Sequence, residues 1–191
     1  MNDFFVALGK FILEYSFAEG VLKRAAAATC GIETPVGFAI FGAQRIRPII
    51  DTMRRVCESK YETLHPLAQE ALVQLAHIND VRDKLLHFGF YRDSDDAYLS
   101  SNESIAHVAT KIKSIRVTAQ DLADMTEDLV VIEMRLLAHC GETKREPDRQ
   151  ARFVQYAQTP FRFKPPQPAL PRGKSSRVLQ TKKSPPKASP L

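Results

Sequence analysis

The sequence predicts an all-α fold, an up-and-down bundle of about four to five helices with a small β-hairpin, followed by a basic, proline-rich tail. Several segments carry apolar residues at three- and four-residue spacing, which is typical of helices with one buried face. Nine of the twelve prolines lie between residues 147 and 190. No apolar run approaches the ~20 residues that a membrane-spanning helix requires, so we expect no membrane partner.

The first helix is predicted over residues 3–29, between a capping Asn2 or Asp3 and Gly31. Glu19 lies on the apolar side of this helix, where a carboxylate must find a partner or reach water. The rest of that side is hydrophobic and comprises Phe4, Leu8, Phe11, Ile12, Tyr15, Val21 and Leu22.

Four further helices follow from start signals and apolar spacing. Thr34 and Pro35 favour a short helix that ends at Phe41, with Thr34 as its cap. Helices over 45–59 and 64–88 each carry a proline in the first turn, where it is tolerated. The last helix starts at Thr118, which forms a capping-box pattern with Asp121, and runs to about residue 140.

Residues 90–117 lose the helical spacing. Two clusters of turn-forming residues, 93–96 and 100–102, interrupt this stretch. We therefore predict short strands near 97–100 and 112–117 that pair as a small hairpin.

The charge is divided unevenly along the chain. Residues 147–191 contain ten Lys or Arg and one acid, a net of +9, so residues 1–146 carry −4 of the total of +5. We predict a helical domain over 1–143 and a basic, Pro-rich disordered tail over 144–191, because such a composition buries too little surface to offset its ordering entropy. Residues 153–163 are the exception, since four aromatic residues there can dock on the domain.

The cysteines and the lack of cofactor motifs limit the chemistry. Cys30, Cys57 and Cys140 are scattered and show no CxxC pairing, which argues against a zinc site and against disulfides. The sequence has no Gly-rich phosphate loop and no carboxylate–histidine metal cluster. We expect a cytoplasmic protein with no metal and no other cofactor.

One segment carries residues suited to chemistry on RNA. Arg82, Asp83 and His87 form an Arg-polar-x3-His motif near the end of the 64–88 helix. Histidine titrates near neutral pH and can donate or accept a proton, while arginine presents forked donors that match phosphate oxygens. Together these groups suit cleavage in which the ribose 2′-hydroxyl attacks the neighbouring phosphate.

This motif, in an all-helical chain with a long first helix, resembles the HEPN superfamily. Asp83 stands where that superfamily most often has Asn, and Phe88 separates His87 from Gly89. The resemblance implies a metal-independent endoribonuclease of the toxin or defence type, a homodimer with both motifs at the interface, and an antitoxin or other partner protein. It also implies that Arg82 stabilises the phosphate and His87 transfers the proton. Asp83 would orient one of them, with Asn79 and Glu19 in support and Glu19 anchoring Arg82.

A second interpretation remains open, a non-catalytic helical module that binds RNA or protein. Arg82 would then pair with Glu19 across the core, and His87 would cap the helix end. Five residues on a helix separate two side chains by about 140°, so Arg82 and His87 share a face only if the helix ends near His87.

The tail also has two interpretations. It is either a solvated extension or an electrostatic arm that holds RNA through basic residues. The arm would comprise Lys174, Arg177, Lys182 and Lys183.

Overall fold

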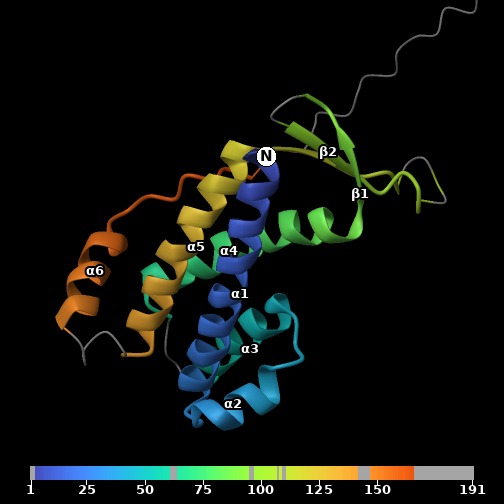
Figure 1. Ribbon diagram of the computed structural model, residues 1–191. Helices are drawn as coiled ribbons and strands as arrows, with labels where there is room; N and C mark the ends of the chain where they lie inside the picture. Colours follow the sequence, from blue (N-terminus) through green and yellow to red (C-terminus); the bar gives the residue numbers. More distant parts are fainter. Residues whose placement is uncertain are drawn as a thin grey trace, which may run out of the picture.

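The computed structural model describes residues 3–60, 64–94, 97–106, 108, 111–141 and 147–165 (Figure 1). Across these residues the chain forms six helices and one three-stranded antiparallel sheet, which confirms the helical class. The elements are α1 (Asp3–Cys30), α2 (Thr34–Phe41), α3 (Ile46–Ser59), α4 (Pro66–His87), β1 (Gly89–Arg92), β2 (Ala97–Ser101), β3 (Ser114–Thr118), α5 (Ala119–His139) and α6 (Pro147–Ala157).

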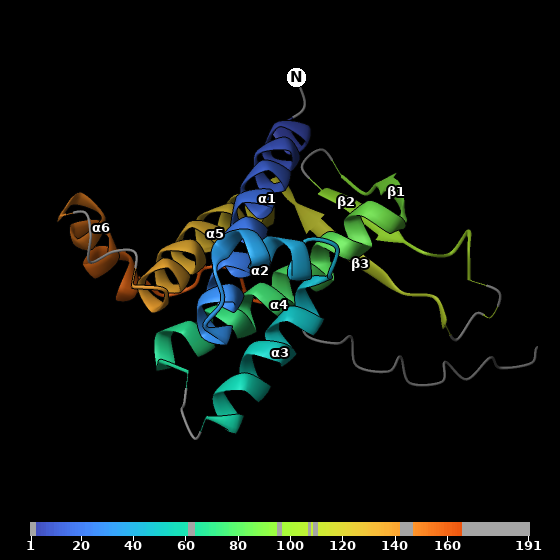
Figure 2. The same ribbon diagram turned by 90° about the horizontal axis from the view of Figure 1, so that it is seen from below.

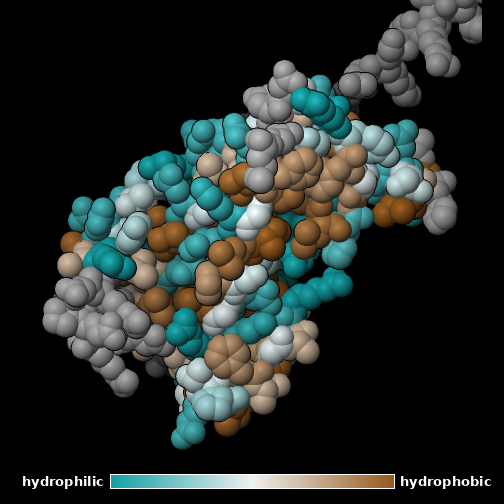
Figure 3. All heavy atoms as spheres, in the orientation of Figure 1, coloured by the Kyte–Doolittle hydropathy of each residue, from teal (hydrophilic) through white to brown (hydrophobic). Residues whose placement is uncertain are grey.

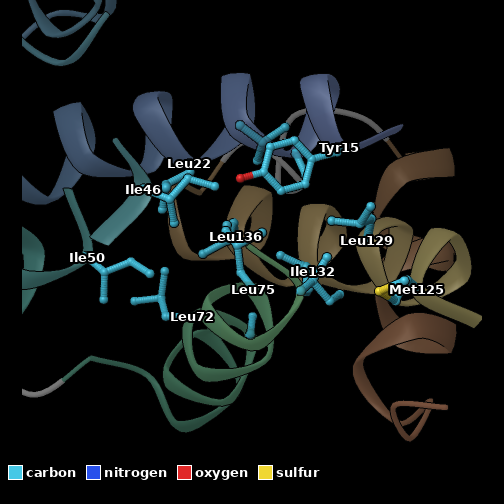
Figure 4. Close-up of a cluster of buried hydrophobic side chains, with 14 of the residues drawn as sticks. Tyr15, Leu22, Ile46, Ile50, Leu72, Leu75, Met125, Leu129, Ile132 and Leu136 are labelled. Atoms are coloured by element: carbon cyan, nitrogen blue, oxygen red, sulfur yellow. The ribbon is translucent and has the colours of Figure 1, made fainter. Parts of the chain in front are cut away.

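The core lies between α1, α4 and α5. α1 and α5 run side by side, and α4 crosses behind them (Figures 1 and 2). Figure 4 shows side chains from these helices and from α3 meeting in one apolar cluster. The predicted helices supply these side chains, among them Phe4, Phe11, Leu22, Leu72, Leu75, Ile78, Leu129 and Ile132, each with no exposed surface.

The predicted helix bounds agree with the structure to within two residues. The capping box of α5 is also confirmed, because the Thr118 hydroxyl accepts from the Asp121 amide at 3.0 Å and the Asp121 carboxylate accepts from the Thr118 amide at 2.8 Å. Thr34 is the first helical residue of α2, and the cap position belongs to Glu33.

The helix α2 lies directly against α1. A Cβ at Gly37 would collide with the side chain of Ala27, so only glycine allows this approach. The loop 42–45 follows α2, and its residues line the cavity described below.

The predicted hairpin is confirmed and is part of a larger sheet. β2 and β3 pair antiparallel from Ala97 opposite Thr118 to Ser101 opposite Ser114. A third strand, β1, pairs antiparallel with β2 and begins two residues after α4 ends. The Ser100 hydroxyl donates to the Lys84 carbonyl at 2.9 Å, which ties the sheet to the end of α4.

The predicted domain boundary at residue 143 is wrong, because the fold continues to about residue 165. The helix α6 packs against α5, and Phe163 is buried in the core. The predicted docking of 153–163 is therefore confirmed, and the predicted disordered tail over 144–191 does not hold for 147–165. The remaining tail, with Lys174, Arg177, Lys182 and Lys183, lies outside the described residues.

Two buried charges of α5 hold the segment 157–163. The Asp128 carboxylate accepts the backbone N–H groups of Arg162 at 2.8 Å and Phe163 at 3.0 Å. Arg135 donates to the carbonyls of Ala157 at 3.1 Å and Thr159 at 2.9 Å. Asp128 is 1% and Arg135 5% exposed. Gln74 and Glu70 each satisfy only part of these groups, at 2.8 and 3.0 Å, so the segment supplies the remaining hydrogen-bond partners of two buried charges.

A half-buried carboxyl between α1 and α5 predicts a pH-dependent stability. Burial, and then the neighbouring Glu14 carboxylate, raise the pKa of Glu133 to about 8, and its Oε1 has no hydrogen-bond partner among the described residues. Because the folded-state pKa is raised, the stabilisation is complete below about pH 4.5 and is lost as the pH rises to about 8.

Replacing Glu133 by Gln should remove this loss. We expect Glu133→Gln to raise the free energy of unfolding at pH 8 by on the order of 1–3 kcal/mol, and to change it little at pH 5. Urea titrations at both pH values measure the effect. Glu58→Gln, at an exposed position of α3, is the control, and identical pH profiles for the two variants would contradict the assignment.

None of the described helices is long and apolar enough to cross a membrane.

Candidate active site

The polar residues of the motif lie at the last two turns of α4. Asn79, Asp83 and His87 follow one another at four-residue spacing, so they lie along one side of the helix. The helix ends at His87, and Phe88 takes an extended conformation with φ −102° and ψ 160°. The chain then enters β1, which leaves the His87 side chain exposed at the helix end.

A hydrogen bond to the adjacent Asp83 holds the Arg82 side chain near that side of the helix. Its Nη1 donates to Asp83 Oδ1 at 3.0 Å, and the other oxygen of Asp83 accepts from Asn79 Nδ2 at 3.3 Å. Although Arg82 and His87 differ by about 140° in helical direction, the long arginine side chain extends over Asp83 and shortens this gap.

Tyr15 of α1 contacts both Asn79 and Arg82. Its hydroxyl donates to Asn79 Oδ1 at 2.5 Å, and its ring lies beneath the Arg82 guanidinium, whose Cζ is 5.1 Å from the ring centroid. Burial raises the pKa of Tyr15 well above its ordinary value, and the Arg82 charge opposes part of this rise. The phenol therefore stays protonated and acts as a hydrogen-bond donor and a cation–π platform.

The predicted pair between Glu19 and Arg82 is wrong. Glu19 Oε1 instead accepts from Lys23 Nζ at 2.8 Å, and the same amine donates to the Gly42 carbonyl at 3.0 Å. Lys23 lies four residues after Glu19 on one helix, a spacing that favours an ion pair. Arg82 is anchored by Asp83 and Tyr15, and Glu19 holds the loop after α2 through Lys23.

These residues surround one open cavity of about 240 Å³. Its lining comes from α1 and α4, and from the loop 42–45 and the first residue of α3. Arg82 and His87 both line the cavity, together with Tyr15, Glu19, Asn79, Asp83 and the loop residues Gly42, Ala43, Gln44, Arg45 and Ile46.

The two central side chains are accessible to a ligand. The Arg82 side chain is 30% exposed, and within the described residues it makes one hydrogen bond. Its Nε is buried, so the donors available to a ligand are the remaining N–H groups of Nη1 and Nη2. His87 is exposed and has no hydrogen-bond partner in the described part of the chain. The arrangement brings a fixed cation and a titratable ring to the same cavity, as phosphate chemistry requires.

Sequence reasoning missed two contributions to this cavity. Tyr15 was predicted on the apolar side of the first helix and is buried in the core, but nothing in the sequence indicated that its hydroxyl and ring would contact Asn79 and Arg82. Arg45 lies in a loop far from the motif in sequence, and no periodic pattern pointed to it.

Comparison of the chain with protein-family models, with curated proteins and with solved structures finds no match in any of the three.

Proposed function

We propose that this protein is a HEPN-like, metal-independent endoribonuclease of the toxin or defence type. The observation that carries the proposal is the position of Arg82 and His87, which line one solvent-open cavity at the end of α4. The helical class and the short helix–strand connection after His87 are consistent with the motif working at a helix end. The HEPN-like bundle itself is part of the proposal.

The proposed reaction needs no group beyond side chains and the RNA. The 2′-hydroxyl oxygen attacks the adjacent phosphorus, the bond to the 5′-oxygen of the next nucleotide breaks, and a 2′,3′-cyclic phosphate forms. His87 transfers the proton between the 2′-hydroxyl and the leaving oxygen, and Arg82 stabilises the charge on the phosphate oxygens. Asp83 and Tyr15 hold the guanidinium in place, which limits its reorganisation during the reaction.

A homodimer would supply two copies of this motif to one substrate. An apolar surface that fits such a contact runs along the outer side of α1, where Phe5, Leu13 and Phe17 are 55–59% exposed. Figure 3 shows hydrophobic side chains gathered over α1 and near α2 on this face. In this proposal an antitoxin or other partner protein competes for the same surface. The molar mass of the protein in solution distinguishes a dimer from a monomer.

One observation favours the alternative, a non-catalytic module that binds RNA or protein. Arg82 is already engaged by Asp83 and by the Tyr15 ring, and such contacts also suit a purely structural arginine. In that case RNA binds and stays intact.

Digestion of single-stranded RNA by the purified full-length protein tests the proposal. We expect cleavage in the presence of a chelator, with products that end in a 2′,3′-cyclic phosphate, and no cleavage of the same strand in 2′-O-methyl form. Intact RNA under all conditions, or products with a 5′-phosphate, would sink the ribonuclease proposal.

A further inference from the structure

The loop 42–45 brings a second guanidinium to the cavity that the motif lines. Arg45 lines the cavity and is exposed, and its side chain makes no hydrogen bond or ion pair with any of the described residues. It immediately precedes α3, but it does not cap that helix through its side chain. No structural task within the described residues therefore accounts for it.

Among the described charged residues around the cavity, Arg45 is the cation that has no paired carboxylate. Glu19 is paired with Lys23 at 2.8 Å, and Asp83 with Arg82 at 3.0 Å, so each carboxylate is matched by one cation. Arg47, two residues further on, is matched as well, because both Asp80 oxygens lie 2.7 Å from its Nη2. Arg45 adds a positive charge that no carboxylate among the described residues compensates, which favours an anionic ligand.

The size of the cavity indicates what kind of anion it holds. Its volume of about 240 Å³ is below the ~300–1,000 Å³ of sites that enclose a whole small ligand. A base with its sugar would extend out of it, whereas phosphate groups of a longer strand can enter one after another. The two arginines that line the cavity can each meet a phosphate of a longer strand, whereas a nucleoside monophosphate offers only one.

We propose that Arg45 binds a second phosphate of the RNA strand, next to the phosphate held by Arg82, so that the site selects an oligonucleotide over a mononucleotide. This inference rests on the proposed function for the choice of RNA. Arg45 is a binding residue in it, and it takes no part in proton transfer.

The test measures binding and needs no cleavage. A fluorescein-labelled 2′-O-methyl RNA hexanucleotide is titrated with the full-length protein and with its Arg45→Ala and Arg47→Ala variants at ~50 and ~200 mM salt. Both substitutions remove one positive charge from the same segment, but only Arg45 lines the cavity. Loss of one single-strand phosphate contact lowers the slope of log affinity against log salt by about 0.7. For Arg45→Ala we therefore expect this smaller slope and, at ~50 mM salt, an affinity at least about threefold below wild type.

The outcomes separate this proposal from the ribonuclease proposal. Arg47→Ala should keep the wild-type slope, and a mononucleotide should compete at least about tenfold more weakly than the unlabelled hexanucleotide. An Arg45→Ala protein that binds like wild type or like Arg47→Ala overturns the second phosphate site, as does equally strong competition by the mononucleotide. If Arg45-dependent binding is found and unmodified RNA stays intact, the site stands and the ribonuclease proposal fails.

Discussion

Replacing His87 by alanine should lower the rate of RNA cleavage by roughly 100- to 10,000-fold, the range that a positioned acid–base group contributes. The imidazole is the only group of the proposed reaction that transfers a proton, and alanine cannot replace it. His87 is exposed at the helix end, so the free energy of unfolding should change by less than about 1 kcal/mol. Single-turnover cleavage of a defined RNA, with urea unfolding of the same samples, measures both effects.

His77→Ala is the matched control for this variant. His77 is also an exposed histidine of α4, but it does not line the cavity, so its loss should leave cleavage unchanged. Equal rates for His87→Ala and wild type, or equal losses in both variants, would remove His87 from the reaction. Arg82 offers a less clean test, because its removal also empties the space above the Tyr15 ring.

A chain that ends at residue 143 should be less stable than one that ends at Pro165 by about 3 kcal/mol. The shorter chain lacks α6 and the segment 157–163, so Phe163 leaves the core. Asp128 loses two backbone donors, and Arg135 loses two carbonyl acceptors. Urea unfolding of the two truncated chains measures the difference directly.

Point variants in the full chain separate the docking contacts from chain length. Asp128→Ala should lower the free energy of unfolding by roughly 2–3 kcal/mol. It removes the acceptor of the buried Phe163 N–H, of the partly buried Arg162 N–H and of one donor of the Gln74 amide, which bonds Asp128 at 2.8 Å. Asp124→Ala, one turn earlier on α5, removes only a bond from Gln120 and should cost less than about 1 kcal/mol. Equal stability of the two truncated chains would restore the boundary at residue 143.

The sequence located the helices well because the information for each is local. Apolar spacing, first-turn prolines and the Thr118–Asp121 capping box lie within the elements that they define, and the structure confirms them. The strand β1 was missed because four residues at a sheet edge carry no such signal, and its pairing with β2 depends on contacts across a turn.

The predicted domain boundary at residue 143 was wrong because it was drawn from the average composition of 147–191, which does not describe the shorter stretch 147–165. The basic, proline-rich character of 147–191 hid the short helix α6. Four aromatic residues did indicate that 153–163 docks, but the charges that hold this segment, Asp128 and Arg135, lie far away in sequence. No pattern within 147–165 indicates that buried partners for its backbone exist elsewhere.

The motif residues of the candidate site were predicted from the sequence, whereas the partner of Arg82 and the contribution of Arg45 were not. Asn79, Arg82, Asp83 and His87 lie on one short stretch, and the structure places them around one cavity. The predicted pairing of Arg82 with Glu19 was wrong because Lys23, one turn from Glu19 on the same helix, pairs with that carboxylate instead. Arg45 was missed because a loop residue comes to a site through the fold alone.

The most direct measurement is a crystal structure of the protein with a 2′-O-methyl RNA trinucleotide, which has the phosphates of the substrate but cannot be cleaved. We expect one phosphate in the cavity at the end of α4, with its oxygens at hydrogen-bonding distance, about 3 Å, from both the Arg82 guanidinium and the His87 ring. An oligonucleotide bound elsewhere while the cavity stays empty would contradict it.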